Sequence, residues 1–172
     1  MRRLLLLLIG LLGGYYAPAQ ERIPQSFSFS VGHLLTKGIQ VSGHYHINTF
    51  DEYRLSYSHN QKTYRVDSLS NLETLPTLQQ QRWTISYVKG LRSRHESLNN
   101  VGLYLGCGIS YGKEQLSTDN LDTRVIGIQF LAELDIALAR KLSLFLNARE
   151  HWLFTNHHGK NGAVGIGLRG YF

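Results

Sequence analysis

Hydrophobic and polar side chains alternate residue by residue over most of the chain beyond residue 25, and this period of two is typical of β-strands. The clearest case is the segment 101–112, in which the odd positions are apolar and the even positions are mostly glycine. The remaining segments alternate in the same way. The predicted strands cover residues 26–34, 38–48, 52–59, 82–89, 101–112, 124–137, 142–153 and 162–172.

The length of these segments favours a membrane. A strand that crosses a bilayer needs about 9 to 11 residues, whereas strands of soluble proteins average about 5 to 6. The segments 38–48, 101–112, 124–137, 142–153 and 162–172 reach the longer class. Beyond the N-terminal segment, polar residues interrupt every apolar stretch, so a spanning helix is not expected and only a closed sheet remains. We therefore predict an all-β, eight-stranded antiparallel transmembrane β-barrel.

A soluble eight-stranded barrel with its apolar face inward, as in ligand carriers, is the rival fold. Two observations favour the membrane barrel. The strand positions that alternate with the apolar ones are rich in glycine, which suits a narrow, crowded lumen. Aromatic residues also lie near the predicted strand ends, where a membrane barrel places its interfacial girdles. The residues expected in these girdles are Trp83, Tyr87, Tyr111, Trp152 and Phe172.

The N-terminus reads as a secretory signal peptide. Arg2 and Arg3 precede an apolar run at residues 4–12, and Ala17-Pro18-Ala19 forms a small-x-small cleavage site. The apolar run is too short to cross a bilayer as a helix, although an uncleaved N-terminal anchor is the alternative. We predict cleavage after Ala19, which leaves residues 20–172 as a single barrel domain.

The connections between the strands predict an orientation in the bacterial outer membrane. With both termini in the periplasm, the long connection 60–81 and the polar connection 113–123 face outward, and the short connections 49–51 and 138–141 face the periplasm. Outer-membrane barrels show this asymmetry. Two connections depart from it: 35–37 is short although it faces outward, and 90–100 is long and polar although it faces the periplasm.

Charge and cysteine content exclude some partners. The formal net charge of +6 falls to +4 when Arg2 and Arg3 leave with the signal peptide, and the remaining basic residues are scattered, so no nucleic-acid surface is predicted. Cys107 is the single cysteine, which rules out an internal disulfide. We expect it to be a small apolar residue on a strand face, with a reactive or intermolecular thiol as the alternative.

In the last three predicted strands, the polar positions that alternate with the apolar ones include several charged residues. Charges inside a narrow lumen must be paired. Glu133 or Asp135 is expected to form a lumen salt-bridge network with Arg149 and Arg169. The simplest role is a structural plug of side chains; the alternatives are a general acid and base or a polar pore.

Other candidate chemistry is weaker. His44 and His46 share a strand face, but they lack a third ligand at a defined spacing, so no metal site and no cofactor are predicted. His151 with Glu150 and a loop serine is the only candidate set for a lipid hydrolase. No glycine-rich phosphate loop follows a strand. We therefore predict that the chain is not an enzyme.

The C-terminal third carries a family resemblance. The segment 130–135 reads Phe-Leu-Ala-Glu-Leu-Asp, the segment 142–152 ends in Ala-Arg-Glu-His-Trp, and the segment 165–168 reads Gly-Ile-Gly-Leu. This pattern within residues 125–172 resembles the TraO family of conjugative transposon proteins. The chain departs from it at His151, where the family tends to have arginine, and in a shorter 113–123 loop without a Tyr-Asp-Gly-like piece.

The resemblance implies a non-enzymatic outer-membrane component of a conjugative DNA transfer apparatus. Its partners would be outer-membrane lipid and other proteins of that apparatus, without direct binding of nucleic acid. A free-standing barrel for envelope stability or adhesion, and a lipid-modifying hydrolase, are the alternatives. Tyr171 and Phe172, at the aromatic end of the closing strand, are the predicted barrel assembly signal.

Overall fold

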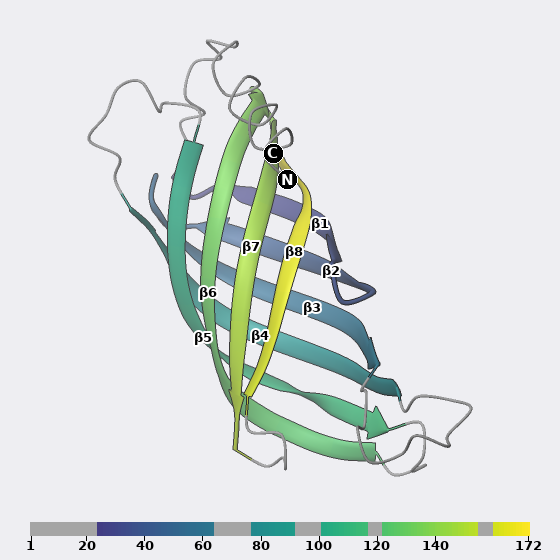
Figure 1. Cartoon of the computed structure of the whole chain (residues 1–172). Helices are drawn as coiled ribbons and strands as arrows, with labels where there is room; N and C mark the ends of the chain where they lie inside the picture. Colours follow the sequence, from purple (N-terminus) through teal and green to yellow (C-terminus); the bar gives the residue numbers. More distant parts are fainter. Residues whose placement is uncertain (1–23, 64–76, 92–100, 117–121, 155–159) are drawn as a thin grey trace.

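A computed structural model describes residues 24–63, 77–91, 101–116, 122–154 and 160–172, which form one closed antiparallel barrel (Figure 1). The strands follow one another around the barrel in chain order, and β1 pairs with β8 to close it. The strands are β1 (Phe27–Leu34), β2 (Gly38–His46), β3 (Asp51–Thr63), β4 (Thr77–Leu91), β5 (Val101–Leu116), β6 (Asp122–Ala139), β7 (Leu142–Leu153) and β8 (Lys160–Tyr171). The predicted fold class is confirmed.

The two ends of the barrel differ in the parts of the chain that lie there. Ser28 pairs with Tyr171, so the start of β1 and the end of β8 lie together at one end, here named the terminal end. The ends of β1, β3, β5 and β7 and the starts of β2, β4, β6 and β8 lie at the other end, here named the loop end. The predicted signal peptide 1–19 and most of the predicted long connections lie outside the described residues, so those predictions stay as they are.

Strand boundaries match the alternation where the strand lies between apolar and polar surroundings. The range of β7 is the predicted one, whereas β4 begins at Thr77, five residues before the predicted start at Arg82. Residues 78–81 read Leu-Gln-Gln-Gln and carry almost no apolar outer face. They are still a strand because β3 and β5 pair with them on both sides. Backbone pairing thus continues toward the loop end, past the point where lipid imposes the alternation.

The outer surface of the barrel is apolar and the lumen is polar. Ile85 and Ile109 each expose 66% of their surface on the outside, whereas Glu133 and Arg169 expose 1% or less inside. The soluble rival is therefore wrong, because it needs its apolar face inward. Within the described ranges, no helix is long and apolar enough to cross a membrane. An apolar exterior of this extent requires contact with lipid.

Aromatic side chains pair across neighbouring strands on the outer surface. The ring centroids of Tyr57 and Trp83 lie 4.9 Å apart, and those of Phe130 and Trp152 lie 5.2 Å apart. Such cross-strand pairs stabilise the register between strands. The residues predicted for the aromatic girdles all lie exposed on this surface: Trp83, Tyr87, Tyr111, Trp152 and Phe172.

Two aromatic rings fill the lumen where glycines leave room for them. A Cβ atom added at Gly32 or Gly167 would lie 2.8 Å or 2.7 Å from Cζ of Phe145, which is 1% exposed. Likewise, a Cβ atom at Gly90 would lie 2.8 Å from the ring of Tyr104. These lumen glycines therefore leave the space that the two rings fill, and the interior is closely packed around both rings.

Cys107 offers a direct test of which face meets lipid. It is exposed on the outer face of β5, where it pairs with Tyr87 and Phe130. In the barrel folded into lipid vesicles, we expect Cys107 not to react with a charged thiol reagent, because hydrocarbon excludes the reagent. The same reagent should label the protein fully in urea, as measured by mass spectrometry.

The control variant Cys107→Ser/Gln79→Cys places the thiol on the outer face four residues beyond Trp83 toward the loop end. It should react while folded. Rapid labelling of Cys107 in the folded native protein would contradict the lipid-facing assignment.

Candidate functional site

A buried carboxylate, Glu133 on β6, lies at the centre of the polar lumen and contacts two arginines. Arg54 from β3 donates across the lumen with its Nη1 2.7 Å from Oε2 of Glu133 and its Nη2 2.8 Å from Oε1. Arg169 from β8 contacts Oε1 through its Nη2. All three side chains expose 1% or less of their surface. The paired N–H bonds from Arg54 have the geometry of a strong charge-assisted contact.

Further acids extend this arrangement on both sides. Arg54 also donates to Oε1 of Glu52, with Nη2 at 2.6 Å, and Arg169 donates from Nη1 to Oδ2 of Asp135 at 2.7 Å. Acid and base therefore alternate along a chain of five residues, here named the inner network: Glu52, Arg54, Glu133, Arg169 and Asp135. Because its members come from β3, β6 and β8, the inner network connects opposite walls of the barrel.

The structure brings together three of the four residues predicted for the lumen network, Glu133, Asp135 and Arg169. It leaves out Arg149, which is 5% exposed and forms no ion pair with a described residue. Two members of the inner network were not predicted, Arg54 and Glu52. Both lie at the polar positions of the alternating pattern in β3. That pattern predicts that they point into the lumen, but it does not predict their contact with residues on the opposite wall.

Glu52 also contacts two histidines, and these contact two serines. Nδ1 of His44 lies 2.9 Å from Glu52 and Nδ1 of His46 lies 3.4 Å from it. The Nε2 atoms of the same rings lie 2.8 Å from Ser30 and Ser28, respectively. The order serine, histidine, carboxylate is that of a hydrolase triad. All these side chains are at most 3% exposed, however, so a substrate has no path to either hydroxyl.

The two histidines are thus held by Glu52 and the serines. No group of three possible metal ligands gathers around a common point in the parts of the chain that the structure describes. The histidine pair instead belongs to the hydrogen-bonded filling of the lumen.

The candidate hydrolase set of Glu150 and His151 is wrong. Neighbouring residues on a strand point to opposite faces. His151 is 4% exposed and points into the lumen, whereas Glu150 lies on the outer surface and accepts a hydrogen bond of 2.9 Å from Nε1 of Trp152. The two side chains are therefore separated by the barrel wall.

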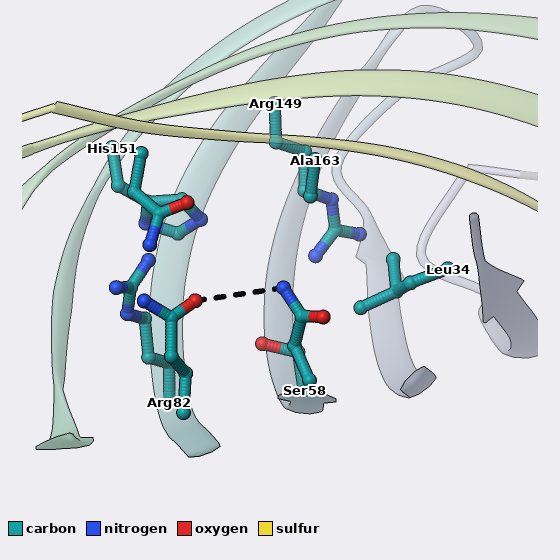
Figure 2. Close-up of a pocket in the computed structure, with 9 residues that line it drawn as sticks. Leu34, Ser58, Arg82, Arg149, His151 and Ala163 are labelled. Carbon is teal, nitrogen blue, oxygen red and sulfur yellow. Dashed lines mark hydrogen bonds between the residues drawn. The ribbon is translucent and has the colours of Figure 1, made fainter. Parts of the chain in front are cut away.

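A second polar cluster lies nearer the loop end. Arg82 on β4 forms an ion pair with Glu114 on β5, and Gln80 donates to the same carboxylate oxygen at 2.8 Å. Beside this pair is a cavity of about 20 Å³. Its wall includes Arg82, Arg149 and His151 (Figure 2). The lumen therefore holds two charge clusters of different composition.

The last two residues point to different sides of the barrel. The Tyr171 hydroxyl donates to Oδ2 of Asp135 at 3.0 Å, which attaches the C-terminus to the inner network. Phe172 is 77% exposed, and its backbone N–H donates to the carbonyl oxygen of Phe27 at 3.2 Å. Their role as an assembly signal remains a prediction.

Comparison with known proteins identifies the architecture. No family model and no curated protein matches the chain. Solved structures do match. Neisserial surface protein A is 16% identical with a TM-score of 0.60, over 86% of this chain and 94% of that one. The N-terminal β-barrel domain of Pseudomonas aeruginosa OprF is 11% identical with a TM-score of 0.59, over 87% and 98%.

The attachment invasion locus protein Ail of Yersinia pestis is similar as well, with 14% identity and a TM-score of 0.54 over 86% of this chain and 97% of that one. The chain has an outer-membrane barrel fold. Its apolar exterior fits the same environment, so fold and surface together are those of a bacterial outer-membrane protein.

Removing the central carboxylate should destabilise the barrel strongly. We expect Glu133→Gln to lower the free energy of unfolding by about 3–5 kcal/mol, because Arg54 and Arg169 then lose a buried counter-charge. Urea unfolding in lipid vesicles, followed by tryptophan fluorescence, measures the change. Asp122→Asn is the matched control, because it breaks an exposed pair with Lys113 and should cost at most about 1 kcal/mol. Equal effects of the two substitutions would contradict the central role of Glu133.

Proposed function

We propose that this protein is a non-enzymatic, non-conducting outer-membrane barrel that serves as a docking component of a conjugative DNA transfer apparatus. The observation that supports a contact role is the filled lumen. The inner network and the rings of Phe145 and Tyr104 occupy the interior, so the barrel offers no passage wide enough for DNA. The protein therefore acts through its ends and its outer surface.

The enclosure of the serine–histidine pairs in the lumen argues against a serine hydrolase. The hydroxyls of Ser28 and Ser30 each contact a histidine ring, and both are closed off inside the lumen. An acyl-transfer site needs room for the substrate beside the nucleophile and donors for the oxyanion. The interior around these serines provides no such room.

The conjugation role rests on the resemblance of residues 125–172 to the TraO family. This segment corresponds to β6, β7 and β8. Part of the shared pattern has a structural explanation, because Glu133 and Asp135 belong to the inner network. Arg149 and Glu150 pair with β6 and β8 through their backbones, but neither side chain belongs to the inner network. Their side chains are therefore the part of the resemblance that the inner network does not explain.

A free-standing barrel for envelope stability or adhesion is the second candidate. The similarity to Ail, whose name describes attachment and invasion, makes it worth testing, although that similarity concerns the fold alone. A mating assay separates the two candidates, because only the first requires the protein for transfer of the element.

We expect deletion of the gene from its element to lower the transfer frequency in matings by about tenfold or more. Wild-type protein supplied in trans should restore transfer, because the loss then reflects a missing component. Glu150→Gln and His151→Ala should restore it as well, since neither side chain serves a reaction. Unchanged transfer after deletion would refute the conjugation role, and selective loss with His151→Ala would revive an enzymatic one.

The purified barrel should not bind single-stranded DNA. Its lumen arginines are buried, and binding to the phosphate backbone requires accessible cations. Fluorescence anisotropy with a labelled oligonucleotide at physiological salt should show no saturable binding. Tight binding that weakens steeply with added salt would contradict a contact role that excludes DNA.

A further inference from the structure

The cavity near the loop end lies beside Arg149, a buried arginine that forms no ion pair with a described residue. Figure 2 shows Arg149 and His151 reaching from above toward Ser58 and Arg82 on the opposite wall. The Nε and Nη2 atoms of Arg149 are buried and form no hydrogen bond with a described residue. Nδ1 of His151 is likewise buried and forms no hydrogen bond with a described residue. A buried, unpartnered guanidinium is strongly unfavourable, so something must occupy the space beside it.

Three amide oxygens around the cavity already accept a hydrogen bond from a neighbouring side chain. Oε1 of Gln80 accepts from Nδ2 of Asn60 at 3.5 Å, and Oδ1 of Asn60 accepts from the Thr36 hydroxyl at 2.6 Å. Oδ1 of Asn161 accepts from Nζ of Lys62. None of these oxygens accepts a hydrogen bond from Arg149, so its Nε and Nη2 donors are left for a particle bound in the cavity. A water molecule needs acceptors for its own hydrogens, whereas an anion only accepts.

The local charge favours an anion as well. Lys62, Arg82 and Arg149 lie at or beside the cavity, and Glu114 is the acid that pairs with this group through Arg82. The inner network has the opposite composition, with three acids and two arginines. Positive charge is thus in excess at the loop end of the described lumen. Lys62 donates to Asn161 and to the carbonyl oxygen of Gly162, whereas Nε and Nη2 of Arg149 have no described partner.

We propose that this cavity binds one chloride ion, held by the Nε and Nη2 donors of Arg149 in a field that Arg82 and Lys62 reinforce. The volume of about 20 Å³ accepts one particle of about the size of a water molecule. A chloride ion is close to this size, whereas phosphate, sulfate and carboxylate ligands are too large for the cavity. The ion supplies the missing counter-charge for Arg149, and the folded barrel is therefore more stable in chloride than in a bulky anion.

Unfolding of the detergent-solubilised full barrel tests the site. At constant ionic strength, replacing sodium gluconate with sodium chloride should lower the unfolding equilibrium constant at least about threefold, with saturation at high chloride, because the ion binds the folded state. Arg149→Met should abolish this dependence. Lys113→Met removes an exposed cation on the outer face of β5 and should keep it. No chloride dependence in the wild type, or an equal dependence in Arg149→Met, would overturn the proposal.

Crystals grown in bromide give a second readout that does not depend on stability. An anomalous peak within hydrogen-bond distance of Nε or Nη2 of Arg149 is expected in the wild type and not in Arg149→Met. Density for a water molecule at that place, without anomalous signal, would also overturn the proposal. Arg149→Lys keeps the charge but loses the forked donors, so it should weaken the bromide peak.

Discussion

The interior of this barrel depends on one carboxylate, Glu133, and on the two arginines that contact it. Lipid on the outside requires apolar side chains there, so the charges of the spanning region must lie within a lumen too narrow to solvate them freely. Arg54 and Arg169 reach Glu133 from β3 and β8, and each carries a further acid, Glu52 or Asp135. The contact thereby joins distant strands through paired charges.

The inner network also specifies the register. A shift of one residue in any of β3, β6 or β8 would turn its charges toward lipid and its apolar residues into the lumen. The cost of that exchange falls on buried ions, which makes it far larger than the loss of one hydrogen bond. The value of the inner network therefore lies in selecting one register as much as in stability. At the loop end the same rule leaves Arg149 without an ion pair, which is why that cavity differs from the rest of the lumen.

The sequence predicts this architecture well where lipid dictates the pattern. Residues 142–153 alternate cleanly because one face of β7 meets hydrocarbon, and the predicted range is the observed one. Residues 77–81 were missed because polar residues occupy both faces there. Parity also identified Glu133, Asp135 and Arg169 as lumen residues. It could not find Arg54 as their partner, since strand tilt decides which residues meet across the lumen.

The alternation also predicts that Arg149 points into the lumen, but it does not predict how far along the barrel axis Arg149 lies. Glu133 pairs with Asn147 on β7, so Arg149 lies two residues further toward the loop end and forms no ion pair with the inner network. The depth of a side chain in the barrel follows from strand register and tilt, which the alternation of one sequence does not contain.

The central claim is that paired charges and aromatic rings close the lumen. The most direct measurement is the ion conductance of the purified full barrel inserted into planar lipid bilayers. The closed lumen predicts a current equal to that of the protein-free bilayer at all applied voltages. Stable unitary conductance steps, present with the folded protein and absent after it is heat-unfolded, would contradict the claim.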